Sequence, residues 1–347
     1  MAKTILSASK IKTLQSCSWT YFCKYILKLP DRTNLGAQLG SIAHIVFEVL
    51  GNPRHQKQYK RIIKNKNIFA SLSVKRLVLK HLFNDDIYTQ ENEDKLKQMI
   101  LTGLNADFHG LEYGKPAESI SEFEFNISHK CENLEYNIKG FIDKLFIYDK
   151  KIIIKDFKTS KKAFDGKDAS SNLQDYLYCL AIKKTYPNIK DIDMHFLFLK
   201  DGVLDGYDVS NSSILIDGCS MKMAGKSDDE LIGFQYELND IQKYADNFSE
   251  KTATSNLAAK QPFPKDGSFS GPLLCGFAKF PGQIKKDGNP MWHCSFKFAF
   301  SYFVLLDDKK EIIKSSFEKK DLLKIKTAKQ SVEQREYSGC PHFNKKN

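Results

Sequence analysis

The alternating pattern between residues 136 and 158 restricts the fold of this chain more than any other feature. Two apolar runs rich in Ile and Phe, at 136–148 and 152–158, flank a polar turn at 149–151. A period of two in such runs is typical of β-strands, and a short polar turn between them is typical of a hairpin. We therefore expect an antiparallel pair of strands here.

Three charged side chains lie inside this hairpin. Asp143 is in the first run, and Asp156 and Lys158 are near the end of the second. Because residues two apart on a strand point to the same face, Asp156 and Lys158 share one side, and the hairpin can bring Asp143 beside them. Buried acids that converge are costly unless a divalent cation neutralises them. The pattern therefore predicts a metal site of the kind that cleaves phosphodiesters.

Periodic segments elsewhere predict an α/β chain. A first helix is expected from the caps Ser7 and Ser9 to about Leu27, with Pro30 behind it. Further helices are expected at 37–50, 71–83, 93–109, 172–185 and 239–248, further strands at 122–127 and 194–199, and a loop at 161–170. The expected order is helices, three strands, a helix and a strand. This order predicts an α/β fold with a central mixed sheet flanked by helices.

The charge of the chain favours a polyanionic partner. Its 347 residues include 53 basic and 42 acidic ones, for a formal net charge of +11, and five of the basic residues are Arg. Lysine suits phosphate contacts better than base readout, so we expect a polyanionic partner to be bound mainly through its backbone, with little sequence specificity. The basic stretch 54–67 fits a solvated helix face better than a dedicated DNA contact.

Two features bear on the compartment. The first ten residues lack an apolar core of signal-peptide length, and the longest apolar run, 298–306, is too short to span a bilayer. We therefore expect a cytoplasmic protein with no membrane partner. Its eight cysteines are then expected to be core residues, metal ligands or cluster ligands rather than disulfides.

Four short motifs occur in order along the predicted core. They are Gly40-x-x-x-His44 on a helix, Gly140-x-x-Asp143 on a strand, Asp156-x-Lys158 on the next strand, and Gln174-x-x-x-Tyr178 on the following helix. Each motif alone is weak, whereas four in order are specific. Together they resemble the RecB-type branch of the PD-(D/E)xK nuclease superfamily, over roughly residues 7–200.

The resemblance implies a restriction-endonuclease-like α/β core with a helical N-terminal part and a cysteine-containing C-terminal extension. It implies catalytic roles for Asp143, Asp156, Lys158, Gln174 and Tyr178. It also implies that His44, Asp143, Asp156 and the carbonyl of Phe157 hold Mg²⁺ or Mn²⁺. The roles of Glu48 and Glu124 are left open: each can support the site or be a solvated carboxylate.

Each of these residues also has an ordinary structural interpretation. His44 can be a satisfied histidine, Asp143 can pair with Lys139 or Lys155, and Gln174 and Tyr178 can be helix packing residues. The joint pattern favours the nuclease site over these readings.

The cysteines suggest a second cofactor. Some members of this branch join the two ends of the chain through a [4Fe–4S] cluster, which implies Cys17, Cys275, Cys294 and Cys340 as ligands. Here 18 residues separate Cys275 from Cys294 and 45 separate Cys294 from Cys340, whereas the family usually keeps two of these ligands within a few residues. Two alternatives stay open: buried unliganded thiols, or a ligand set that includes Cys23, Cys131, Cys179 or Cys219.

These observations lead to one functional hypothesis. We expect a metal-dependent DNA nuclease. The resemblance implies that it acts as an exonuclease in recombination, repair or phage DNA processing, in the cytoplasm of a bacterial or phage-infected host cell, with a helicase or recombination partner not identified by any residue. The alternatives are a structure-specific endonuclease on the same fold and a non-cleaving nucleic-acid-binding module. We expect residues 1–210 to form the core and 211–347 to form a helical, cysteine-containing extension that closes back on the N-terminal helix.

Overall fold

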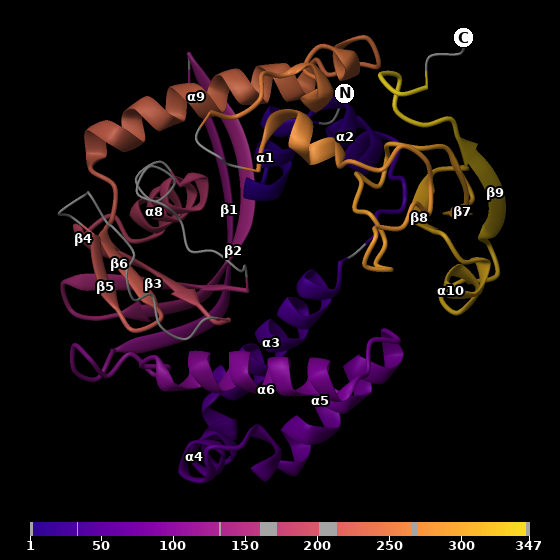
Figure 1. The fold of residues 1–347 in the computed structure, drawn as a ribbon. Helices are drawn as coiled ribbons and strands as arrows, with labels where there is room; N and C mark the ends of the chain where they lie inside the picture. Colours follow the sequence, from indigo (N-terminus) through magenta and orange to yellow (C-terminus); the bar gives the residue numbers. More distant parts are fainter. Residues whose placement is uncertain are drawn as a thin grey trace. The chain divides into compact units, whose positions relative to one another are not determined.

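The computed structural model describes residues 3–32, 34–131, 133–159, 172–200, 214–265 and 269–344. The chain divides into two compact units (Figure 1). Unit 1 comprises Met1–Leu6 and Thr33–Gln242, and unit 2 comprises Ser7–Arg32 and Lys243–Asn347. The boundary expected at residue 210 falls among residues 201–213, outside the described residues.

Unit 1 is built on a six-stranded sheet in the order β1-β2-β3-β4-β6-β5. Its strands are β1 Glu118–Cys131, β2 Leu134–Ile147, β3 Lys151–Lys158, β4 Asp191–Phe198, β5 Ile214–Asp217 and β6 Ser220–Ala224. The pair β3–β4 is parallel and the other neighbouring pairs are antiparallel. The expected mixed sheet is therefore confirmed, and so is the antiparallel hairpin of β2 and β3.

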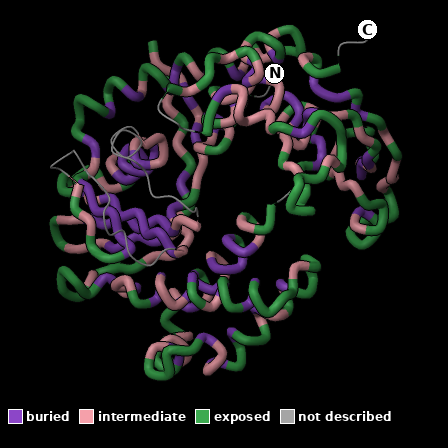
Figure 2. The backbone as a smooth tube through the Cα atoms, in the orientation of Figure 1, coloured by how far each residue is buried: buried purple, intermediate pink, exposed green. Residues whose placement is uncertain are grey.

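Strand β3 lies at the centre of the core. Every residue from 152 to 157 is buried, and Figure 2 shows the buried residues concentrated in the central strands. Continuous burial of this kind is expected of a strand with a parallel neighbour and helices on both faces. Within the described ranges, no helix is long and apolar enough to cross a membrane.

Four helices, which precede the sheet in sequence, cover one of its faces. They are α3 Leu35–Gly51, α4 Gln56–Asn65, α5 Leu72–Asn84 and α6 Gln90–Asn105. Phe157 of β3 packs into their core, where its ring stacks on that of Phe47 at 4.2 Å. The basic stretch 54–67 forms mostly α4, in which Ile62 is buried and the charged side chains are exposed, as expected of a solvated helix.

Two helices lie against the sheet elsewhere. Helix α8, Leu173–Thr185, begins at Asn172, whose side chain accepts a hydrogen bond from the Gln174 amide. Helix α9, Asp228–Asp246, is longer than the helix expected at 239–248 and packs on α8 through the rings of Tyr176 and Phe234. The loop expected at 161–170 lies outside the described residues.

Unit 2 begins with a broken helix. Helix α1, Ala8–Ser16, starts at the cap Ser7, as expected, but it ends at Cys17, where the backbone is extended. Helix α2, Ser18–Tyr21, and a π-helical turn, Phe22–Ile26, follow. The expectation of one continuous helix to Leu27 was therefore wrong, because Ser18 turns its hydroxyl to carbonyls of residues 253 and 256.

The rest of unit 2 contains a small antiparallel sheet. Its order is β8-β7-β9, with β7 Phe300–Leu306, β8 Ile312–Ser316 and β9 Ser331–Tyr337, and the short helix α10 Lys319–Leu323 lies between β8 and β9. A helical extension was expected here from the sequence, and these strands were not. They are five to seven residues long, and their side chains become buried against Cys23 and Leu29 from the other end of the chain.

Candidate active site

His44 and Asp143 hold the end of β3 between them. Nδ1 of His44 lies 3.2 Å from Oδ1 of Asp143, and Nε2 lies 3.1 Å from the carbonyl oxygen of Phe157. The amide of Phe157 donates a hydrogen bond of 2.7 Å to Oδ2 of Asp143. Helix α3, strand β2 and strand β3 therefore meet at the backbone of Phe157.

The ordinary interpretation of Asp143 was wrong. Lys139 pairs with Glu124 at 2.5 Å, and Lys155 pairs with Asp107 at 3.2 Å, so both lysines have other acidic partners. Asp143 instead faces His44. Glu124, which the sequence left open, is half-exposed and belongs to this surface ion pair.

Gly40 explains why the histidine motif begins with glycine. A Cβ at Gly40 would lie 2.6 Å from Oγ1 of Thr159, just beyond the end of β3. Glycine therefore lets α3 approach the strand closely, and His44, one turn further along, reaches the backbone of Phe157.

The second acid, Asp156, faces helix α8. Its Oδ1 accepts hydrogen bonds from the Tyr178 hydroxyl at 3.2 Å and from Nε2 of Gln174 at 3.3 Å. Nζ of Lys158 lies 2.5 Å from Oδ2 of Asp156 and donates to Oε1 of Gln174, also at 2.5 Å. The two helix residues that the sequence singled out thus contact the acid and the lysine directly.

Burial dominates the electrostatics of Asp156. Its side chain is 4 % exposed, and burial raises its pKa, although the charge of Lys158 opposes this shift. Burial, with the charge of Asp156, also raises the pKa of Tyr178 well above its usual range, so its hydroxyl stays a donor. Oδ2 of Asp156 receives no hydrogen bond from the described residues, and the ion pair with Lys158 is its polar contact.

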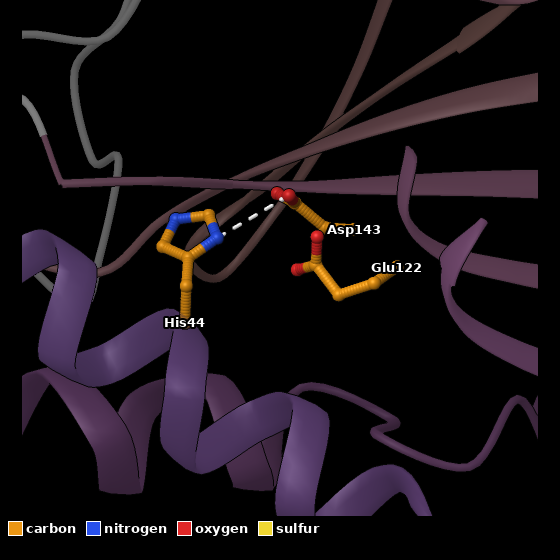
Figure 3. A group of neighbouring side chains, drawn as sticks. All are labelled: His44, Glu122 and Asp143. Carbon is orange, nitrogen blue, oxygen red and sulfur yellow. Dashed lines mark ion pairs between the residues drawn. The ribbon is translucent and has the colours of Figure 1, made fainter. Parts of the chain in front are cut away.

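Glu122 on β1, which no sequence motif indicated, also lies at this site. Ligand atoms of His44, Glu122 and Asp143 all lie within 4.8 Å of one another, and Figure 3 shows the three side chains pointing toward a common centre. The pairs Ser121↔Lys144 and Phe123↔Ile142 place Glu122 opposite Asp143. The pairing of β1 with β2 is the signal that identifies it, and sequence alone left that register open.

The two groups that face Asp143 both have a raised pKa. Burial, followed by the charge of Asp143, raises the pKa of Glu122 to about 7. Burial alone lowers the pKa of His44, but the hydrogen bond and charge of Asp143 outweigh it and raise that pKa to about 8. The raised pKa values partly reflect negative charge concentrated at this point, and a bound cation would offset that charge.

A hollow of about 460 Å³ opens at this point of unit 1. It is lined by Ala37, Gly40, Ser41, His44, Ile45, Glu48, Glu122, Asp143 and Thr159. Its titratable lining consists of one imidazole and three carboxylates, so the donor set suits a hard divalent cation. Glu48, left open by the sequence, lines the hollow and adds to the charge that raises the pKa of Glu122.

Unit 2 gathers the four cysteines expected to act as ligands. The Cys294 amide donates to the Cys275 carbonyl at 3.2 Å. Burial raises the pKa of Cys275 to about 12 and that of Cys294 to about 11, with charges from Cys17 and Cys340 among the further causes. Burial, and then the charges of cysteines in this group, also raise the pKa of Cys23, whose thiol donates a hydrogen bond of 3.5 Å to the Tyr337 hydroxyl.

The other three cysteines belong to unit 1. Cys131 is exposed at the end of β1, Cys219 is buried beside β6, and Cys179 contacts Asp175 within α8. They therefore belong to a different compact unit from Cys17, Cys275, Cys294 and Cys340.

Comparison with known proteins identifies the family. The family model described as the PD-(D/E)XK nuclease superfamily matches residues 5–277. The chain therefore belongs to the PD-(D/E)XK nuclease superfamily, whose fold it shares, and it is a phosphodiester hydrolase of the class that uses divalent metals and acts on nucleic acid. The resemblance drawn from the four motifs is confirmed at this level.

More specific comparisons give weaker matches. No curated protein matches the sequence. Among solved structures, a "putative exonuclease" from Eubacterium rectale is 12% identical, with 75% of this chain and 91% of that chain covered and a TM-score of 0.42. The protein SSO0001 is 16% identical, with 49% of this chain and 69% of that chain covered and a TM-score of 0.25.

Proposed function

We propose that this protein is a metal-dependent DNA nuclease that acts as an exonuclease in recombination, repair or phage DNA processing. The observation that carries the proposal is the convergence of His44, Asp143, Asp156 and Lys158 around the end of β3. A non-cleaving binding module would have no chemical need for the complete set of a histidine, two acids and a lysine at one point of the fold.

The ligand set we propose is His44, Asp143, Asp156 and the carbonyl of Phe157, joined by Glu122. Mg²⁺ and Mn²⁺ both accept such oxygen ligands, and the imidazole suits Mn²⁺ in particular. Among the described residues, the polar contact of Asp156 Oδ2 is the ion pair with Lys158, which leaves this oxygen with a lone pair for a cation. Binding requires His44 to give up one of its two contacts, either to Asp143 or to the Phe157 carbonyl.

The residues around Asp156 have separate tasks in this proposal. A bound divalent ion supplies Lewis acidity to the scissile phosphate and stabilises the leaving oxygen. Lys158 orients the attacking water and offsets the charge that builds on the phosphate. Gln174 fixes the ammonium of Lys158, and the Tyr178 hydroxyl fixes the carboxylate of Asp156, so both act as positioning residues.

We further propose that Cys17, Cys275, Cys294 and Cys340 hold a [4Fe–4S] cluster. The mutual charge interactions of these thiols support it. A single zinc ion fits less well: bonds of about 2.3 Å would require sulfurs about 3.8 Å apart. Among the described residues, the group whose ligand atoms all lie within 4.8 Å of one another is His44, Glu122 and Asp143. The four cysteines do not form such a group.

Cleavage of labelled DNA tests the nuclease proposal. With Mg²⁺ or Mn²⁺, the protein should degrade end-labelled linear DNA, and Asp156→Asn and Lys158→Ala should each lower the rate at least about 100-fold, because each removes a pre-organised charge. Lys139→Ala, which removes a surface lysine on β2, is the matched control and should cleave normally. Wild-type cleavage by Lys158→Ala would disprove the site assignment.

Closed circular DNA separates the two modes of action. An exonuclease leaves it intact while it degrades the linear form. Cleavage of both forms at similar rates would instead identify an endonuclease on the same fold.

A further inference from the structure

Unit 2 exposes a group of large apolar side chains on one short segment. Between the candidate cluster residues Cys275 and Cys294, the exposed side chains are Phe277 at 68%, Phe280 at 57%, Ile284 at 62% and Trp292 at 48%. Soluble proteins rarely leave so many large apolar groups in water within one segment, and such patches usually mark an interaction site. None of these residues takes part in the metal site of unit 1.

Backbone pairing gives this segment a defined form, which we call the aromatic hairpin (residues 276–293). Gly276 pairs with His293 at its base, and Ile284 pairs with Pro290 near its tip. The Met291 amide donates to the Gln283 carbonyl at 2.7 Å between these two points. The exposed rings therefore stand on an ordered support rather than on a loose chain.

The base of the aromatic hairpin requires glycine. Gly276 has a φ of +69°, and a Cβ there would lie 2.4 Å from the carbonyl oxygen of Trp292. The rings of Trp292 and Phe269 form an edge-to-face pair with centroids 5.3 Å apart. This contact leaves nearly half of the Trp292 side chain exposed.

The charges on the aromatic hairpin favour an anionic partner. Lys279, Lys285 and Lys286 are exposed on the same segment as the rings. The segment has one acid, Asp287, so its local net charge is +2. The Asp287 carboxylate accepts a hydrogen bond of 3.0 Å from the Asn289 amide, so this acid helps to form the turn of the hairpin. Rings interleaved with lysines offer both a stacking surface and phosphate contacts.

We propose that the aromatic hairpin binds single-stranded DNA, with Phe277, Phe280 and Trp292 stacking on unpaired bases and the three lysines contacting the backbone. Paired bases hide their faces inside the duplex, so a surface of exposed rings selects the unpaired strand. A protein partner would also cover apolar side chains, but it would not by itself account for three lysines among them. The inference rests on the proposed DNA nuclease function and specifies single-stranded DNA as the form that the protein binds.

Fluorescence of Trp292 gives a direct test without catalysis. The full-length protein contains two tryptophans, and Trp19 is partly buried and hydrogen-bonded to Tyr337. In EDTA, which prevents cleavage, a short oligothymidylate should quench the emission, and Trp292→Phe should remove this quenching. An abasic oligonucleotide of the same length, with phosphates but no bases, should leave the emission nearly unchanged.

Alanine variants measure the contribution of the other rings. Phe277→Ala and Phe280→Ala should each weaken binding of labelled oligothymidylate at least about fivefold, the lower end of base–aromatic stacking. Phe83→Ala, which removes an equally exposed ring from α5 in unit 1, is the matched control and should bind normally. Duplex DNA of the same length should compete poorly for the labelled strand.

Three results would overturn the proposal: no quenching by oligothymidylate, equal quenching by the abasic strand, or wild-type affinity in both phenylalanine variants. The surface would then be assigned to a protein partner. Because binding is measured in EDTA, failure here is distinct from failure of the nuclease proposal, which is measured as Asp156-dependent cleavage with metal. Quenching without any cleavage would leave the DNA-binding hairpin standing and would remove the nuclease proposal.

Discussion

At the scale of single residues, the site contains one backbone position that is unfavourable for its residue type. Glu122 has a φ of +51°, in the left-handed region that non-glycine residues seldom occupy within a strand. Its neighbours Ser121 and Phe123 keep their regular partners on β2. The strand is therefore distorted at the one residue whose carboxylate faces His44 and Asp143, and strain of this kind is typical of functional positions.

We expect Glu122→Gln to weaken Mn²⁺ binding about tenfold or more, because the amide keeps the size of the side chain but loses its charge. Isothermal calorimetry of Mn²⁺ binding to the folded protein measures the change. Glu124→Gln is the matched control, since Glu124 lies two residues away on the same strand and pairs with Lys139 at the surface. Equal Mn²⁺ affinity in the two variants would exclude Glu122 from the ligand set.

At the scale of secondary-structure elements, helix packing in unit 1 depends on how closely α6 approaches α3. A Cβ at Gly103 of α6 would lie 2.5 Å from the Phe47 ring, which itself stacks on Phe157 at the site. Gly233 of α9 is different, because it is exposed and a Cβ there would meet nothing within 4 Å.

The two glycines give a matched pair of predictions. Gly103→Ala should lower the free energy of unfolding of unit 1 by about 1–3 kcal/mol, because the added methyl group overpacks the core. Gly233→Ala should raise it by about 0.5–1 kcal/mol, because alanine favours the helix. Urea unfolding followed by circular dichroism measures both. A destabilised Gly233→Ala protein, or an unchanged Gly103→Ala protein, would contradict this account of the packing.

A second feature at this scale is a row of basic side chains across three strands. Lys155 of β3, His195 of β4 and Lys222 of β6 are adjacent in register and all buried. Neither ring nitrogen of His195 has a hydrogen-bond partner among the described residues. Burial, and then the charges of the two lysines, lowers the pKa of His195 to about 3.

This row predicts acid sensitivity. Because the pKa of His195 is depressed from 6.5 to about 3, the unfolded chain binds a proton that the folded chain does not, so stability falls as the pH drops from 6.5 toward 3. The full shift corresponds to a loss of up to about 5 kcal/mol. His195→Gln should flatten the dependence of unfolding free energy on pH between 7 and 4. An unaltered slope in that variant would show that other groups cause the acid sensitivity.

At the scale of the whole molecule, unit 2 is assembled from the two ends of the chain. Residues 7–32 pack with residues 243–347, and Trp19 donates a hydrogen bond of 2.6 Å to the Tyr337 hydroxyl. Joining segments so far apart in sequence is entropically costly, and a link between them is stabilising because it restricts the unfolded chain.

We expect Cys17→Ala to lose the brown colour of an anaerobically purified iron–sulfur protein and to lower the thermal stability of unit 2. Cys131→Ala, which removes an exposed thiol from unit 1, should do neither. Visible absorption and iron content measure the cluster, and calorimetry measures the unfolding of each unit. A colourless wild-type protein prepared with ample iron would reject the cluster and leave these residues as buried thiols.

The sequence by itself determined the elements that depend on neighbouring residues. The period of two in β2 and β3, the helical pattern of α3 and the cap at Ser7 all act over a few residues, so they were predictable. The placement of Asp156 beside Lys158 followed from strand geometry alone. The four motifs added the helices on which His44, Gln174 and Tyr178 lie, and the family match confirmed the class.

Tertiary structure decided the features that depend on residues far apart in the chain. Glu122 joins the site through the register of β1 on β2, and a one-residue shift would turn it away. The helix stops at Cys17 where Ser18 bonds to carbonyls more than 230 residues away. The strands β7–β9 likewise acquire their core from Cys23 and Leu29. Local patterns carry no information about such partners, because the free energy of these contacts appears only once the distant segments have packed together.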